Sequence, residues 1–146
     1  MTAVAHDFPS PAWVAAYEHA INTSDEYRSA STDWTHGCVA LVMPAQPAIG
    51  VSEDVGIWLD LDRGVCRAAK LVSRAEAQQA PFVLTAEYRY WKQIIKKELG
   101  PIAGIMQRKV GLVGSLPIVV RFIKSAEALV DAATRVPTRF LDDARC

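Results

Sequence analysis

The sequence predicts an α+β fold, in which five strands form one sheet and helices cover one face of it. Two helix starts are marked by a serine shortly before a proline, at Ser10 with Pro11 and at Ser115 with Pro117. Two strand-like runs flank a short polar turn at residues 62–64, which indicates a hairpin. With 146 residues, 51% of them hydrophobic, the chain fits a single domain, 1–146, with a core over about 10–135.

The first half of the chain predicts one helix and four strands. The helix runs from Pro11 to about Arg28, because large apolar residues beginning at Trp13 recur at helical spacing. A polar loop over 29–37 precedes a buried strand at 38–43, which Pro44 and Pro47 end. The hairpin strands are 56–61 and 65–72, and a fourth strand follows at 82–85.

The second half predicts two helices around a fifth strand. Residues 88–99 have helical periodicity and are stopped by Gly100 and Pro101. A helical turn or loop at 102–106 leads into a strand at 109–114. A strongly amphipathic helix then runs from Leu116, with Ser115 as its N-cap, to Ala133. We expect the tail after Pro137 to be frayed.

Opposite charges divide the sequence, although their sum is zero. Residues 1–62 hold one basic and nine acidic side chains, a net charge of −8, and residues 63–146 hold fifteen and seven, a net charge of +8. Either a basic face meets an anionic membrane or an acidic partner, or the two halves neutralise each other in the fold. A nucleic-acid partner is not expected, because no zinc-finger spacing, RNA-binding motif or basic repeat accompanies the charge.

The cysteines and the apolar runs favour a soluble, cytoplasmic protein. Cys38, Cys66 and Cys146 are too few and too scattered for a disulfide framework, and a reducing compartment suits them. The start of the chain has no export signal. The longest uncharged run, 35–52, contains Pro44 and Pro47 and cannot form a membrane-spanning helix.

The short motifs predict structural roles and no metal or cofactor. Asp60, Asp62 and Gly64 have the spacing of a calcium loop, but a third oxygen ligand before the glycine and the glutamate at its twelfth position are missing. His36 and Cys38 are two ligands without a complement. Gly111 and Gly114 form no phosphate loop, and glycines in a strand more often mark a close backbone approach or a kink.

Apolar residues in the last third of the chain exceed what its helices and strand need, and three interpretations stay open. They form ordinary core or an adaptable cavity. With a cavity, the chain is either a lipid carrier or a small enzyme acting on an apolar substrate, with Asp60 or Glu87 as general base. A third alternative is a protein-interaction accessory domain.

Three segments in that region resemble the sterol carrier protein family. They are YWKQII at 90–95, MQRKVGLVG at 106–114, and the helix over 116–129 with RFIKS at 121–125. The hairpin also fits, so the resemblance covers roughly 37–133. Two positions depart from the family pattern: Ser115 replaces an acidic or amide residue, and Gly111 replaces a lysine.

The resemblance implies a mostly antiparallel sheet enclosing a hydrophobic tunnel for a fatty acid, acyl-CoA, phospholipid or sterol-like ligand, with no catalysis by the domain. The residues expected to line the tunnel are Trp91, Ile95, Ile105, Met106, Leu112, Leu116, Val119 and Phe122. An anionic membrane surface would meet a basic segment, for which we name Arg89, Lys92, Lys96 and Lys97, with Arg108 and Lys109 nearby. A homo-oligomer stays open.

Overall fold

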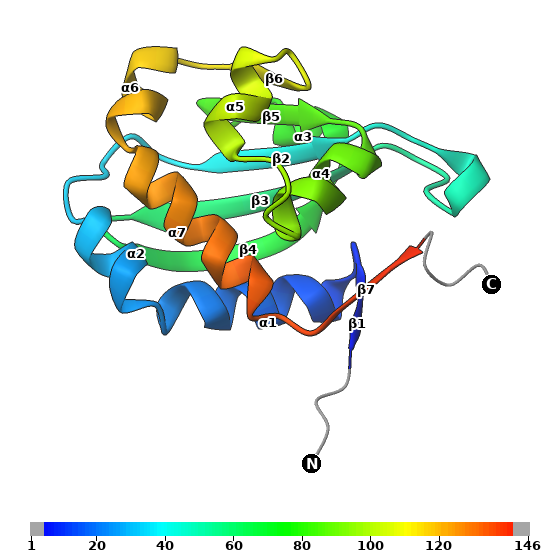
Figure 1. Cartoon of the computed structure of the whole chain (residues 1–146), viewed down its shortest axis with the longest axis horizontal. Helices are drawn as coiled ribbons and strands as arrows, with labels where there is room; N and C mark the ends of the chain where they lie inside the picture. The colour runs from blue at the N-terminus through cyan, green and yellow to red at the C-terminus, as the bar shows by residue number, and fades with distance from the viewer. Residues whose placement is uncertain (1–4, 142–146) are drawn as a thin grey trace.

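A computed structural model describes residues 5–141, and its centre is a five-stranded mixed sheet in the order β4-β3-β2-β5-β6 (Figure 1). The middle strand β2 pairs in parallel with β5, and every other neighbouring pair is antiparallel. The α+β class and the five strands are therefore confirmed. The strands are β2 (Val39–Met43), β3 (Val55–Asp62), β4 (Val65–Val72), β5 (Phe82–Ala86) and β6 (Val110–Val113).

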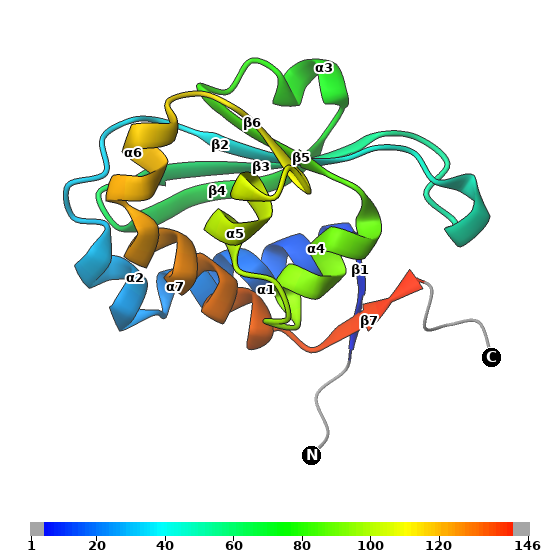
Figure 2. The same ribbon diagram turned by 45° about the horizontal axis from the view of Figure 1, so that its top comes forward.

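The helices cover one face of this sheet, with one exception. Figure 2 shows α3 (Arg74–Ala77) on the opposite side of the sheet from the other helices, so the prediction of a single covered face was wrong at this point. Apolar Ala77 and Ala80 pack there against the sheet, because a short segment rich in alanine can approach a sheet closely. The helices of the main face are α1 (Pro11–Asn22), α2 (Asp25–Ala30), α4 (Tyr88–Ile95), α5 (Pro101–Met106), α6 (Leu116–Arg121) and α7 (Ile123–Thr134). A 3₁₀ turn, η1 (Pro47–Ile49), follows β2.

Both serine N-caps are confirmed. The hydroxyl of Ser10 accepts a hydrogen bond from the Trp13 amide at 3.1 Å, and that of Ser115 accepts one from the Ile118 amide at 3.4 Å. Gly114, just before the second cap, has φ +132°, and a Cβ there would lie 2.8 Å from a ring carbon of Phe82. The close backbone approach expected at the strand glycines is thus confirmed at Gly114.

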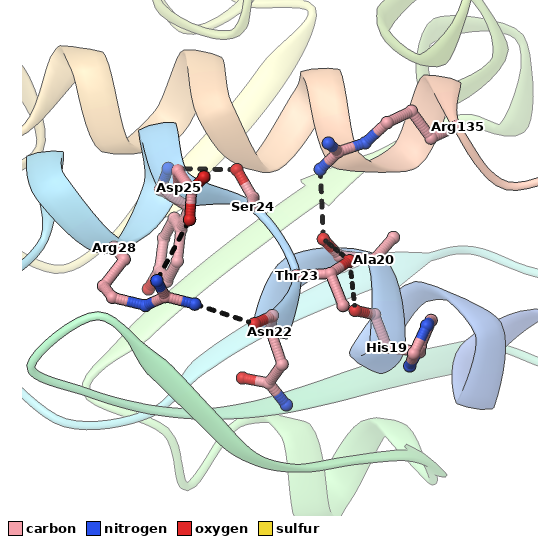
Figure 3. A network of polar contacts seen from close by, with 9 residues as sticks. His19, Ala20, Asn22, Thr23, Ser24, Asp25, Arg28 and Arg135 are labelled. Carbon is pink, nitrogen blue, oxygen red and sulfur yellow. Dashed lines mark hydrogen bonds and ion pairs between the residues drawn. The ribbon is translucent and has the colours of Figure 1, made fainter.

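The predicted first helix is two helices, which is a correction to its expected end near Arg28. Figure 3 shows the junction: the Thr23 hydroxyl donates to the His19 carbonyl at 2.9 Å, and Ser24 caps α2 by accepting from the Tyr27 amide at 3.0 Å. Arg135 of the segment after α7 donates to the Ala20 carbonyl at 3.0 Å. These polar contacts satisfy the backbone groups that a helix break frees.

The predicted last helix is also divided, between α6 and α7 at Phe122. This residue has φ −101° and ψ 33°, and its ring is buried, at 8% exposure. The change of direction turns its ring into the core while the apolar periodicity of the sequence continues across the break. Similarly, α4 ends at Ile95 rather than near Leu99, because Lys97 takes a left-handed conformation with φ +62°.

The hairpin is confirmed, and the backbone conformation of its turn explains why a glycine stands there. Arg63 and Gly64 connect β3 to β4 with φ +49° and +88°, the left-handed pair that a two-residue hairpin turn requires. A Cβ on Gly64 would also lie 2.9 Å from the carbonyl oxygen of Arg28. Glycine therefore serves both the turn and its contact with α2.

The two ends of the described chain meet in a terminal strap, made of β1 (His6–Phe8) paired in parallel with β7 (Thr138–Phe140). The frayed tail predicted after Pro137 was therefore wrong for residues 138–140, while residues 142–146 lie outside the described part. Asp7 and Arg139 form an ion pair at 2.6 Å across the strap. The Tyr88 hydroxyl donates to the Phe8 carbonyl at 2.6 Å and accepts from the Leu141 amide at 2.9 Å, which anchors both strands to α4.

Candidate functional site

An apolar hollow of about 100 Å³, which we call the first hollow, lies between the sheet and its covering helices. Strand alternation supplies its floor: Val39, Leu41 and Met43 of β2 point toward the helices, while Ala40 and Val42 point to the other face. In β3, the side chains of Ile57 and Leu59 also point toward the helices. Leu84 of β5 and Val110 of β6 also line it. The remaining walls come from the strap and the helices, through Phe8, Trp13, Tyr17, Trp91, Ile94, Ile95, Pro101, Ala126, Leu129, Val130 and Ala133.

The aromatic residues of this lining direct their polar atoms away from the hollow. The indole N–H of Trp13 donates to Thr138 Oγ1 at 2.8 Å, and that of Trp91 donates to the Val42 carbonyl at 3.0 Å. The Tyr17 hydroxyl donates to the Leu129 carbonyl at 3.0 Å, and burial raises the pKa of Tyr17, so the phenol stays neutral. The walls therefore offer ring faces and alkyl groups, without a polar group that lacks a partner.

A second hollow of about 70 Å³ lies next to the first, beneath α6 and the start of α7. Four residues line both hollows and form a waist between them: Val39, Leu84, Ala126 and Leu129. The rest of the second lining consists of Tyr27, Trp34, Leu61, Phe82, Val119, Phe122 and Ser125. The Ser125 hydroxyl donates to the Ala30 carbonyl at 3.0 Å and accepts from Ser31 Oγ at 2.8 Å, so this lining too is apolar.

The hollows are small for a ligand pocket. Pockets that hold drug-sized ligands have about 300–1,000 Å³, whereas a leucine-lined engineered cavity of about 150 Å³ holds benzene. Two adjacent voids at a shared waist can combine if Ala126 and Leu129 of α7 move away from Val39 and Leu84 of the sheet. A larger guest thus requires α7 to move outward.

The sequence-predicted lining residues divide into three groups. Trp91 and Ile95 line the first hollow, and Val119 and Phe122 line the second. The other four, Ile105, Met106, Leu112 and Leu116, line neither. Met106 is 67% exposed, because α5 turns it outward. Ile105 packs against the core, and Leu112 pairs with Leu84 across β5 and β6.

Most of the first hollow was missed by sequence reasoning, which placed the cavity under the last third of the chain alone. Trp13 and Tyr17 of α1, together with β2 and β3, contribute much of its wall. A signal for them existed: two large aromatics four residues apart on one helix face, opposite an uninterrupted apolar strand at 39–43.

The two carboxylates considered as general bases lie away from both hollows. Asp60 alternates along β3 with Leu59 and Leu61, whose side chains face the helices, and it pairs with Arg67 on β4 at 2.9 Å. Glu87 precedes α4 and pairs with Arg89 at 3.0 Å. Neither carboxylate is positioned to act on a guest of the hollows.

The four basic residues expected to face a membrane are engaged within the protein. Arg89 pairs with Glu87, and Lys97 pairs with Asp131 of α7 at 2.6 Å. The amines of Lys92 and Lys96 lie 5.2 and 5.7 Å from the centre of the Phe140 ring in the strap. This set therefore connects α4 and its following turn to the strap and to α7.

Two wider features of residues 5–141 bear on the site. No group of three or more His, Cys, Asp or Glu side chains is placed to hold a metal ion within that range. The helices described there are all too short or too polar to cross a membrane.

Comparison with solved structures finds close similarity. The chain superposes on a crystal structure of sterol carrier protein 2 with a TM-score of 0.81 and 32% identity, covering 87% of this chain and 97% of that one. A conserved hypothetical protein of Thermus thermophilus, described as possibly a sterol carrier protein, gives 0.80 and 31%, over 89% and 90%. Sterol carrier protein 2 of Yarrowia lipolytica, in its apo form, shares the fold at a TM-score of 0.54 and 11% identity, over 84% and 89%. No protein-family model matches the chain, and no curated protein sequence matches it.

Proposed function

The chain belongs to the sterol carrier protein family, and from this premise we propose that it binds a lipid by its acyl chain and transfers it without chemical change. One observation carries the proposal. Both hollows have apolar walls, and in the first the indole N–H groups of Trp13 and Trp91 and the hydroxyl of Tyr17 are all engaged in hydrogen bonds. Such walls favour an alkyl chain and disfavour a polar guest, which would lose its hydration without replacement.

The waist favours a flexible chain over a rigid ring system as the guest. Two small voids joined at Val39, Leu84, Ala126 and Leu129 can be threaded by a chain that adapts to the constriction. About ten buried methylenes would contribute about 8 kcal/mol at about 0.8 kcal/mol each. Association and ordering cost about 4–15 kcal/mol, so chain length decides whether binding is measurable. Fatty acid, acyl-CoA and phospholipid all provide such a chain.

Lipid content and chain-length dependence test the proposal. We expect the organic extract of freshly purified protein to contain acyl lipid by mass spectrometry. Calorimetry of delipidated protein against saturated fatty acids of about 8 to 18 carbons should show affinity that rises with length into the micromolar range. Trp13 and Trp91 line the first hollow, so their fluorescence should change on loading.

A matched pair of variants locates the bound chain. Ala126→Trp fills the waist, while Ala75→Trp adds the same bulk at an exposed position of α3 on the opposite sheet face. We expect the first to abolish fatty-acid binding and the second, if it folds by circular dichroism, to retain it. An extract without lipid, together with affinity independent of chain length, would contradict the proposal and favour an accessory domain. Unchanged binding by Ala126→Trp would place any bound lipid elsewhere.

A further inference from the structure

An exposed apolar and basic surface lies on the segments that wall the two hollows. Five large hydrophobic side chains are exposed among the described residues, and four of them lie between residues 99 and 126. They are Met106 at 67% exposure, Val113 at 69%, Val120 at 45% and Ile123 at 38%. In Figures 1 and 2, α5, β6 and α6 lie together on one side of the molecule, with α7 starting beside them. We call this surface the α5–β6–α6 face.

The same segment is basic without any acidic residue. Residues 99–126 contain Arg108, Lys109, Arg121 and Lys124 and no Asp or Glu. None of the four forms an ion pair with the residues of 5–141. Lys109 and Arg121 each lie 5.7 Å from the centre of an aromatic ring, that of Tyr90 and that of Phe122, and Lys124 shares a surface groove with Glu26, Glu127 and Asp131. By contrast, Arg89 and Lys97, in the set expected from the sequence, already have acidic partners. Because the whole chain is neutral, attraction to a negative surface would come from this local excess of charge.

The combination fits an anionic lipid bilayer. Exposed apolar side chains on segments that also carry cations without an ion-pair partner can insert at the level of the headgroups while the cations contact lipid phosphates. A second copy of this chain fits poorly, because a symmetric contact through this face would bring two sets of the same four cations together. The open edge of β6 could pair with another strand, but charge opposes that pairing.

The face is continuous with the hollows. Pro101 of α5 and Val110 of β6 line the first hollow, and Val119 of α6 and Phe122 line the second. Each segment therefore has one side on a hollow and another on the exposed face. A bilayer that holds these segments would lie directly beyond the walls that an incoming acyl chain has to pass.

We propose that the α5–β6–α6 face docks on anionic bilayers, with Met106, Val113 and Val120 inserted and the four cations on lipid phosphates, so that lipid passes between bilayer and hollows there. The exchange step rests on the proposed function, whereas docking can be measured without it. The surface differs from the basic set predicted from the sequence, since only Arg108 and Lys109 were named there.

Vesicle sedimentation tests the docking. The probes are vesicles of phosphatidylcholine alone and vesicles with about 30% phosphatidylglycerol, which gives a strong negative surface potential. We expect binding only to the second kind, weakened by salt. The variant R108Q/K109Q/R121Q/K124Q should reduce partitioning on the order of tenfold or more, given the contribution of each basic residue near a bilayer. The matched control, R89Q/K92Q/K96Q/K97Q, removes four charges elsewhere and should reduce it much less.

Separate substitutions test the apolar part and the competing occupant. M106S/V113S/V120S keeps the charge and, because these side chains are exposed, should keep the fold by circular dichroism while it weakens vesicle binding. Loss of binding by the control set but not by the first set would overturn the proposal. So would salt-sensitive dimerisation in sedimentation analysis that Val113→Lys abolishes, since a second copy would then be the occupant. Docking by protein that binds no fatty acid would refute the proposed function and leave the docking face standing.

Discussion

The two faces of the central sheet both make apolar contacts with helices, but the two hollows lie on one face, while α3 packs closely on the other, which we call the solid side. On the hollow side, large residues such as Leu41 and Leu59 face helices that leave space between their side chains. On the solid side, Ala40, Val42 and Val83 meet Ala77 and Ala80 at α3. A Cβ added to Gly56 there would lie 3.0 Å from the Ala77 Cβ. The difference shows that void space depends on how closely a covering helix approaches the sheet, rather than on how apolar the contact is.

Alkaline pH should produce the largest change in the free energy of unfolding. The groups responsible lie mainly on the side of the sheet that holds the hollows. Burial, and then the charge of Glu18, raises the pKa of the Cys66 thiol to about 12 from 9.0, and burial raises that of Tyr27 to about 12 from 10.0. Unfolded chains would ionise these groups from about pH 9 upward while the folded protein keeps both protons. The free energy of unfolding should therefore be constant up to about pH 8.5 and then fall by about 1.4 kcal/mol per pH unit for each retained proton.

Urea unfolding from about pH 7 to pH 11 measures this slope. Cys66→Ala should flatten the curve in the alkaline half of that range. On the solid side, Cys38 has a pKa raised by burial and by Asp60, but its half-buried thiol should matter less, so Cys38→Ala is the comparison. An equal effect of the two substitutions would mean that the two faces shield their thiols alike.

A core deletion should have the next largest effect. Leu59 is fully buried and lines the first hollow, so Leu59→Ala should lower the free energy of unfolding by about 2–5 kcal/mol. Leu59→Ala also enlarges the first hollow. Palmitate should therefore restore more stability to the Leu59→Ala variant than to a Val42→Ala variant, whose substitution lies on the solid side. Unfolding in urea with and without the fatty acid measures both. Equal restoration in the two variants would contradict a guest on the Leu59 side.

Substitutions that enlarge a side chain should cause the smallest changes in the free energy of unfolding. The sign of the change should differ between the two faces of the sheet. Gly56→Ala forces a contact with Ala77 and Val72 and should cost about 1–3 kcal/mol of stability, with fatty-acid affinity unchanged. Ala126→Leu adds bulk at the waist and should change stability by less than about 1 kcal/mol, or increase it, while it weakens fatty-acid binding. Thermal unfolding of delipidated protein, followed by calorimetry, separates the two results. A larger stability loss from Ala126→Leu than from Gly56→Ala would show the waist to be tightly packed.

The sequence predicted elements that local chemistry specifies. Serine caps, the turn at Arg63 and Gly64, and the apolar strands all depend on neighbours close in the chain. It could not show that α1 ends at Asn22, because the break there depends on distant partners. The amide of Asn22 donates to the Cys66 carbonyl at 2.8 Å, and its oxygen accepts from the Cys66 amide at 2.9 Å. The strap was missed for the same reason.

The candidate site was harder to predict than the fold. Periodicity identifies residues that face the interior, but it does not tell a side chain that borders a void from one that fills it. Trp91 and Met106 both stood in apolar segments near each other, yet Trp91 lines the first hollow and Met106 is exposed. Which of them meets the hollow depends on α4 ending at Ile95 and on the direction that α5 then takes.

The parallel arrangement of β1 and β7 has a mechanical consequence. Tension applied to the two strands from outside the domain would pull His6 and Phe140 in opposite directions along the strand axis, since His6 pairs with Thr138 and Phe8 with Phe140. The load would then fall on all the strap's hydrogen bonds and on the Asp7–Arg139 ion pair in shear, instead of opening them one at a time. A stretched chain would resist at the terminal strap first, before force reached the helices that cover the two hollows.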